Sequence, residues 1–408
     1  MTEVTDATGP TSRGAPAIPL SVLDLSPITS GSTPGRALRN SIDLAQRAEA
    51  AGYHRYWLAE HHFTPGVASS APALLIGQIA AATSSIRVGS GAVQTGHQTP
   101  VSIVEQFGIL DALFPGRIDL GLGRSGQRRA ELEADVGAGT NGQARPAQRE
   151  PREVTPRVVD GLLIPKPFSY AALAGSTRLR YLNAQLQQAG AEVPDYGRQV
   201  DEILGLLRGS LTSPDGDLVL AVPGEGADLE VWIFGSSGGA SARVAGAHGL
   251  AFAASYHITP SSALGAVEAY RAAFRPAEGR SRPHVAVSAD VVVADDEAGA
   301  RELASPYGLW VRSIRTGQGA IPFPSPAEAA RHRWSDGDRE LVADRVDTQF
   351  VGTASQVADQ LETLARVTGA DELVVTTITH RHADRVHSLE LLADEWRARV
   401  PRQEVRSS

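Results

Sequence analysis

The side chains best suited to chemistry stand together at Glu60, His61 and His62, directly after the short strand expected at residues 53–59. Histidine titrates near neutral pH, so this cluster predicts a site that handles protons or forms hydrogen bonds with a ligand. Neighbouring side chains at a strand end point to opposite sides, and we therefore expect one of the two histidines to face a pocket. The competing interpretation is a set of polar side chains that only satisfy one another.

A metal site is a further alternative for the same region. His380 and His382 follow the last expected strand, which would neighbour the first strand in a closed barrel, and four histidines at one rim could hold a divalent ion. Hydrolytic metal barrels usually carry two histidines at the end of the first strand, where this chain has residues 23–25, Leu-Asp-Leu. The sequence contains no cysteine, so thiolate ligands are excluded. We expect no metal.

Two glycine-rich segments suggest a bound ligand. Residues 89–92 (GSGA) end an apolar run, and glycine at such a place lets another backbone or a flat ligand approach closely. Residues 235–241 (GSSGGAS) lie between a strand and a helix, where free backbone N–H groups and the helix dipole favour a phosphate, although serine is also common as a plain helix cap. Arg124 follows another strand and could pair with a phosphate or lie in solvent.

The elements that must position these residues alternate between strand and helix. Strands are expected at residues 18–25, 53–59, 86–93, 117–122, 229–234, 250–255, 284–293 and 372–377. Helices are expected at residues 36–51, 71–83, 100–114, 197–208, 261–274, 297–304, 355–367 and 383–399. This alternation predicts a parallel α/β sheet, and the count favours a single (β/α)8 TIM barrel with a long insertion after the fourth strand. An open doubly wound sheet is the second choice.

The domain organisation follows from the same pattern. We expect a disordered N-terminal tail (1–17), one barrel (18–399) and a C-terminal tail (400–408). Residues 125–195 interrupt the alternation, and an insertion of this length in a compact domain is typically a functional lid or a disordered segment.

The composition excludes several classes of function. The 408 residues carry a formal charge of −8 without long charged blocks, which argues against a nucleic-acid or membrane partner. No apolar run approaches the roughly 18 residues of a membrane span. The N-terminus does not resemble a secretory signal, so we expect a cytoplasmic protein.

Taken together, these segments resemble the bacterial luciferase-like flavin monooxygenases, in particular the oxidoreductases associated with natural-product biosynthesis. The resemblance covers nearly all of residues 18–395. It is carried by GYHRYWLAEHH, ASSAP, IRVGSGAV, EQFGILDALFPGRIDLGLGR, WIFGSSGGASARVAGAHGLAFAASYH and VGTASQVADQLETLARVTGADELVVTTITH.

The resemblance implies a two-component enzyme. A separate flavin reductase would supply reduced FMN, and O2 would be activated as a C4a-peroxyflavin that oxygenates a small organic substrate, such as a secondary-metabolite intermediate. His61 would be the catalytic histidine, and a cis peptide would join Gly91 to Ala92 behind the flavin ring. The residues implied to bind the cofactor are Glu60, Gly91, Ala92, Gly123, Arg124, Ser236, Ser237 and Gly238.

The substrate is not implied by the resemblance, because the chain departs from the family pattern beside the expected pocket. The residues expected to line the substrate side are His62, Gln94, His97 and Tyr256. Hydroxylation, epoxidation and Baeyer–Villiger insertion all remain open. The alternatives are an F420-dependent oxidoreductase on the same barrel and a non-catalytic flavin-binding protein. A homodimer through the first helices is a further expectation.

Overall fold

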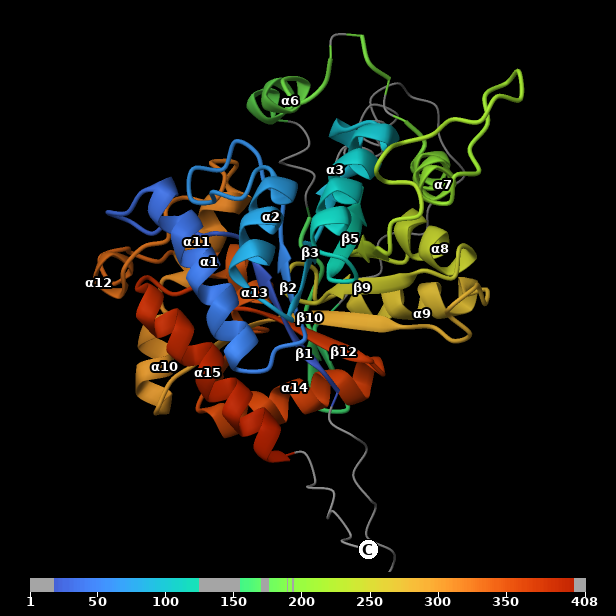
Figure 1. Ribbon diagram of the computed structural model, residues 1–408. Helices are drawn as coiled ribbons and strands as arrows, with labels where there is room; N and C mark the ends of the chain where they lie inside the picture. The colour runs from blue at the N-terminus through green and yellow to red at the C-terminus, as the bar shows by residue number, and fades with distance from the viewer. Residues whose placement is uncertain (1–17, 125–154, 170–175, 189, 193, 400–408) are drawn as a thin grey trace, which may run out of the picture.

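Eight parallel strands form a closed barrel at the centre of the protein (Figure 1). They are β1 (Leu20–Asp24), β2 (Arg55–Leu58), β3 (Arg87–Ser90), β5 (Ile118–Gly123), β8 (Glu230–Gly235), β9 (Ala251–Ser255), β10 (Val285–Val293) and β12 (Glu372–Thr376). Each strand pairs with the next in this order, β9 pairs with β10, and β12 returns to β1. The predicted TIM barrel is therefore confirmed, and the open sheet is wrong. The computed structural model describes residues 18–124, 155–169, 176–188, 190–192 and 194–399.

Helices cover the outside of the barrel and bury the outer faces of the strands. They are α1 (Pro34–Ala50), α2 (Pro72–Ala82), α3 (Pro100–Leu113), α7 (Tyr196–Leu207), α8 (Ala240–Ala247), α9 (Ala263–Ala273), α10 (Glu297–Ala304), α14 (Ala354–Thr368) and α15 (His382–Arg399). Local signals set their ends. Thr33 caps α1 by accepting from the amide of Arg36, and Gly52, at φ 82°, lets the chain turn into β2. Among the described helices, none is long and apolar enough to cross a membrane.

Several elements supplement the eightfold pattern. Between β10 and β12 the chain forms α11 (Tyr307–Arg315), α12 (Pro326–Ala329), α13 (Asp336–Val346) and β11 (Phe350–Gly352), whereas the sequence analysis left residues 305–346 unassigned. Short elements also follow β3 and β5, namely β4 (Val93–Gln94), η1 (Thr95–His97), β6 (Arg157–Val159), β7 (Leu162–Ile164) and α6 (Thr177–Ala184). The expected tails and most of the expected lid lie outside the described residues.

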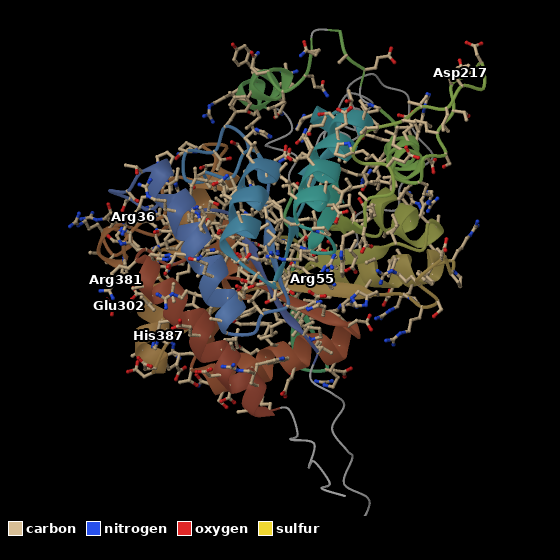
Figure 2. All side chains as sticks on the ribbon, in the orientation of Figure 1. Arg36, Arg55, Asp217, Glu302, Arg381 and His387 are labelled. Atoms are coloured by element: carbon tan, nitrogen blue, oxygen red, sulfur yellow. The ribbon has the colours of Figure 1, made fainter. Side chains whose placement is uncertain are left out.

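A layer of paired charges fills the end of the barrel where the strands begin. Arg55 Nη1 lies 2.9 Å from Asp119 Oδ2 and 2.7 Å from Glu230 Oε2, and Arg55 Nε lies 3.1 Å from Glu372 Oε2. Burial raises the pKa of Asp119, against the lowering effect of Arg55 and Arg87. Arg55 lies inside the molecule, unlike the other labelled charged side chains (Figure 2). Each buried charge therefore has a partner, as burial requires.

Candidate active site

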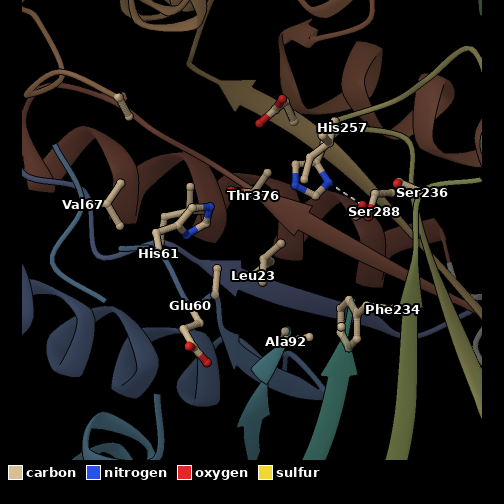
Figure 3. A pocket seen from close by; sticks show the side chains of 18 of the residues that line it. Leu23, Glu60, His61, Val67, Ala92, Phe234, Ser236, His257, Ser288 and Thr376 are labelled. Carbon is tan, nitrogen blue, oxygen red and sulfur yellow. Dashed lines mark hydrogen bonds between the residues drawn. The ribbon is translucent and has the colours of Figure 1, made fainter. Parts of the chain in front are cut away.

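A cavity of about 400 Å³ opens at the other end of the barrel, where the strands finish. Active sites of this fold lie on that face, and the volume is in the range of ligand pockets. Its apolar lining includes Leu23, Leu25, Trp57, Val67, Phe234, Trp310, Val311, Ile314 and Ile378. Its polar lining includes Glu60, His61, Gln94, Arg124, Ser236, Ser255, His257, Ser288, Asp290, Arg315, Arg345 and Thr376 (Figure 3).

His61 faces this cavity from the segment after β2. Its amide donates to the carbonyl of Ser69, which fixes the backbone, while the ring nitrogen Nδ1 is buried and has no hydrogen-bond partner among the described residues. Burial lowers the pKa of His61 to about 4, although Glu60 acts in the opposite direction. The ring is therefore neutral at physiological pH, and it stands among the residues that line the cavity.

Glu60 and His62 form a separate polar cluster beside the cavity. The Glu60 carboxylate lies 2.8 Å from His62 Nε2 and accepts a hydrogen bond of 3.0 Å from the amide of Gln94. Gln94 Oε1 lies 3.1 Å from His97 Nε2, and the His62 and His97 rings meet edge to face at 5.8 Å. Glu60 and Gln94 also line the cavity, whereas His62 and His97 are not among its described lining residues. As the strand-end argument predicts, only one of the adjacent histidines faces the pocket.

The cavity floor contains the glycine-rich end of β3. The peptide bond between Gly91 and Ala92 is cis, as the family resemblance implies. A Cβ added at Gly91 would lie 2.8 Å from Leu23 Cδ1 and 3.2 Å from Trp57 Cβ, so any larger side chain would displace the floor. Trp57 Nε1 in turn donates to Asp119 Oδ2 at 2.8 Å, which connects this floor to the charged layer beneath it.

Arg124 and the start of α8 form one end of the cavity. Arg124 Nε donates to Ser241 Oγ at 3.0 Å, and its guanidinium lies 5.8 Å from the centre of the Tyr196 ring. The carbonyl of Ser236 accepts hydrogen bonds from hydroxyls on the segment before α9, which hold this turn in place. A helix start beside an arginine favours binding of an anion.

The other residues predicted near this end take different positions. Gly123 lines the cavity, and a Cβ there would lie 3.2 Å from Ala92 Cβ. Ser237 and Gly238 are not among the described lining residues. A Cβ at Gly238 would lie 3.0 Å from the carbonyl oxygen of Gly265, so this glycine lets α8 begin close to α9.

The opposite wall contains residues that the sequence analysis missed. His257, after β9, has its Nδ1 2.5 Å from Ser288 Oγ in β10. Asp290 hydrogen-bonds with Tyr307, and Arg345 Nη2 lies 3.4 Å from Asp290 Oδ2. Burial raises the pKa of Asp290, with Arg345 opposing that shift. The sequence does hold a signal for His257, because it closely follows the expected strand at residues 250–255, as His61 follows the strand at residues 53–59.

Tyr256 and the two late histidines lie away from the cavity. The Tyr256 hydroxyl donates to the carbonyl of Leu163 at 2.7 Å, towards β7, and Tyr256 is not a described lining residue. His380 Nε2 lies 3.2 Å from the carbonyl of Ser30, and His382 Nε2 lies 2.7 Å from an Asp43 oxygen. Within the described residues, no group of three or more His, Asp or Glu side chains is placed to hold a metal ion.

Comparison with known proteins identifies the family. The model of the luciferase-like monooxygenase family matches residues 18–152 and 182–372. YvbT, an uncharacterized protein of Bacillus subtilis, is 37% identical over 384 residues, which is 93% of this chain and 97% of YvbT. A luciferase-like monooxygenase of Escherichia coli is 32% identical over 92% of this chain and 96% of its own length.

A solved structure agrees with the sequence relatives. The structure of apo-MsnO8 is similar with a TM-score of 0.72 at 29% identity, covering 93% of this chain and 98% of that one. The family model spans most of the sequence, and the Bacillus relative exceeds 30% identity over nearly its whole length. This chain therefore belongs to the luciferase-like monooxygenase family, and its enzyme class is that of the flavin-dependent monooxygenases.

Proposed function

We propose that the protein uses reduced FMN and O2 to oxygenate a small organic substrate, with reduced FMN supplied by a separate flavin reductase. The observation that carries this proposal is a cavity with an anion-favouring end at Arg124 and an unpartnered neutral imidazole, His61, among its lining residues. A flavin mononucleotide has a phosphate at one end and a flat ring at the other, and this arrangement fits both.

The residues present fit the cofactor by two further criteria. The floor at Gly91 packs against Leu23 and Trp57 with no room for a Cβ, so its bare backbone could lie against a flat ring. Thr376 Oγ1 lines the cavity and, like His61 Nδ1, has no partner among the described residues. Buried polar atoms are normally hydrogen-bonded, so two such atoms on residues that line one cavity support a polar ligand nearby.

The bound flavin supplies the oxygen and redox chemistry, and the chain's residues supply orientation and proton handling. Arg124, Ser236 and the amides at the start of α8 would hold the phosphate. The His61 imidazole would hold or move a proton at the reacting end, because it is neutral and lines the cavity there. The apolar walls of Trp310 and Ile314 would exclude water from this region.

An anaerobic titration tests the cofactor assignment. Reduced FMN is added to the protein without O2 and compared with reduced F420, and the complexes are then mixed with aerated buffer. We expect FMN to bind more tightly than F420. We also expect His61→Asn to lower O2 consumption by the complex about 100-fold or more, which is the range of general acid–base effects. Tighter binding of the deazaflavin with turnover independent of O2 would overturn the proposal.

F420-dependent hydride transfer is the second candidate, because the fold admits it. Solved structures of this fold include a Baeyer–Villiger monooxygenase component in complex with FMN, at 18% identity and a TM-score of 0.57. They also include an F420-dependent secondary alcohol dehydrogenase, at 14% identity and a TM-score of 0.55. Both share only the fold with this chain, so the titration above decides between them. A flavin-binding protein without catalytic activity would bind FMN but show no effect of His61→Asn on O2 consumption.

We also propose a homodimer through α2 and α3. Leu74 on α2 is 76% exposed, and Ile109 and Leu113 on α3 are 51% and 66% exposed. Exposed apolar side chains on two neighbouring helices support an interface on this face. Light scattering of the purified protein should give twice the chain mass, and Leu113→Glu should restore the monomer mass. A wild-type monomer would refute this proposal without affecting the proposed chemistry.

A further inference from the structure

The far wall of the cavity carries an imidazole whose hydrogen bonding is unequal on its two nitrogens. His257 is 8% exposed, and within the described part of the chain its ring hydrogen bonds are confined to Nδ1, which lies 2.5 Å from Ser288 Oγ. The ring projects into the cavity from β9 towards the side where His61 stands (Figure 3). Nε2 is therefore the nitrogen that a ligand would meet.

The neighbours of Ser288 decide which nitrogen carries the proton. A serine hydroxyl has one hydrogen, and Ser288 Oγ is placed to donate it to the carbonyl of Ala254 at 3.3 Å. With that hydrogen directed at the Ala254 carbonyl, the Ser288 oxygen accepts from His257, and Nδ1 carries the ring proton in this arrangement. In this arrangement the Ser288 hydroxyl donates to the Ala254 carbonyl and accepts from Nδ1, whereas a hydroxyl turned towards His257 would give up the first of these bonds.

The surroundings also keep His257 uncharged. Burial lowers its pKa to about 3, and the neighbouring Arg345 and His61 add to the effect. Arg345 lies on the same wall and His61 on the opposite one. A positively charged group is therefore near His257 on one side, and a second imidazole faces it on the other. A neutral ring protonated at Nδ1 presents a lone pair at Nε2, and it can only accept a hydrogen bond there.

We propose that His257 Nε2 is the acceptor for a hydroxyl or N–H group of the molecule bound in the cavity, so that this wall selects ligands that donate a hydrogen bond. Ser288 is then a positioning residue, because it acts only by fixing the ring proton. Two sources can supply the donor. One is a hydroxyl of the substrate, and the other is a ribityl hydroxyl of the flavin, which rests on the function proposed above.

The ring tautomer can be measured without any ligand. In protein labelled with ¹⁵N-histidine, the His257 signals are identified by their loss in His257→Gln. In the wild-type protein we expect the Nε2 resonance at the position of an unprotonated ring nitrogen and the Nδ1 resonance at the position of a protonated one. Ser288→Ala should shift the signals towards the other tautomer. A proton on Nε2 in the wild-type protein overturns the proposal, whatever the cofactor is.

Two pairs of ligands then identify the source of the donor. 2-Indanol and 2-indanone share a shape, but only the alcohol donates a hydrogen bond. Riboflavin and lumiflavin share a ring, but only riboflavin has the ribityl hydroxyls. One neutral hydrogen bond corresponds to about threefold to tenfold in affinity. His257→Phe should remove that preference from one pair, and His257→Gln should preserve it, because an amide oxygen also accepts.

The outcomes separate this inference from the proposed function. Loss of the indanol preference assigns the donor to the substrate, and loss of the riboflavin preference assigns it to the cofactor. Unchanged preferences in both pairs, with an unchanged melting temperature, overturn the inference. Failure of the protein to bind FMN would refute the proposed function, but it would leave the tautomer and the indane comparison intact.

Discussion

Replacing Arg124 by methionine tests the assignment of the phosphate end of the cavity. Arg124 is part-buried and already held by Ser241 and by the Tyr196 ring, so little side-chain freedom is lost when an anion binds. Hydrogen bonds to charged groups contribute roughly 1.5–3 kcal/mol each. That range corresponds to an FMN affinity weakened by about 10-fold to 150-fold. Methionine retains most of the side-chain length and removes the charge.

The assay is a thermodynamic cycle with FMN and riboflavin, which differ only in the phosphate. Dissociation constants are measured by fluorescence titration for the wild type and for Arg124→Met. We expect the FMN value to rise by the factor above and the riboflavin value to stay within about twofold, because a surface-like substitution usually changes energies by no more than about 0.5 kcal/mol. Added salt should weaken FMN binding in the wild type more than in the variant, because ions screen the charge.

Arg198→Met is the matched control. Arg198 is exposed on α7 and pairs with Glu202 at 3.0 Å, and it does not line the cavity. Arg198→Met removes the same charge from the chain, so an equal loss of FMN affinity in both variants would mean that the effect comes from net charge. Equal weakening of FMN and riboflavin in Arg124→Met would place Arg124 at the ring or in the fold, and would refute the phosphate assignment.

Three further predictions follow from the cavity and the charged layer. Gly91→Val should lower FMN affinity at least tenfold in the same titration while leaving the circular dichroism spectrum unchanged, because its side chain must displace Leu23; unchanged affinity would contradict this. Glu372→Gln should lower the free energy of unfolding by about 3 kcal/mol in urea, because it leaves the buried Arg55 short of a partner; a loss below about 1 kcal/mol would count against that role. His61 binds its proton more weakly when folded, at a pKa of about 4 against an ordinary value of 6.5, so wild-type stability should fall as pH falls through this window. His61→Asn should flatten that slope by up to about 1.4 kcal/mol per pH unit, and identical slopes would show that the ring is not desolvated.

The fold could be predicted because its signals are local. Thr33 and Gly52 mark the ends of one helix–strand connection, and fully buried β-branched runs such as β10 mark parallel strands. Residues 305–346 were not predicted because α11 is short and its apolar stretch, residues 307–311, is followed at once by Arg312 and Arg315, whose partners lie elsewhere in the chain.

The site could be predicted only in part. The family resemblance singled out His61, whereas alternation along the strand predicted only that one of the two histidines faces the pocket. The pairing of His257 with Ser288 depends on the register of β9 against β10, which the sequence does not reveal. The direction of Tyr256 depends on β7, which belongs to the insertion and has no strand-length apolar pattern.

The charged layer at the base of the barrel also affects when the chain can fold during its synthesis. Arg55 and Glu372 are separated by 317 positions, so at roughly 5–20 residues per second about 15 to 60 s pass between their synthesis. During that time Arg55 has only some of its carboxylate partners, and its free energy is lower in water than in an incomplete core. The barrel therefore closes after the last strand leaves the ribosome, and an N-terminal fragment that ends before β12 should need the missing piece in trans before it can fold.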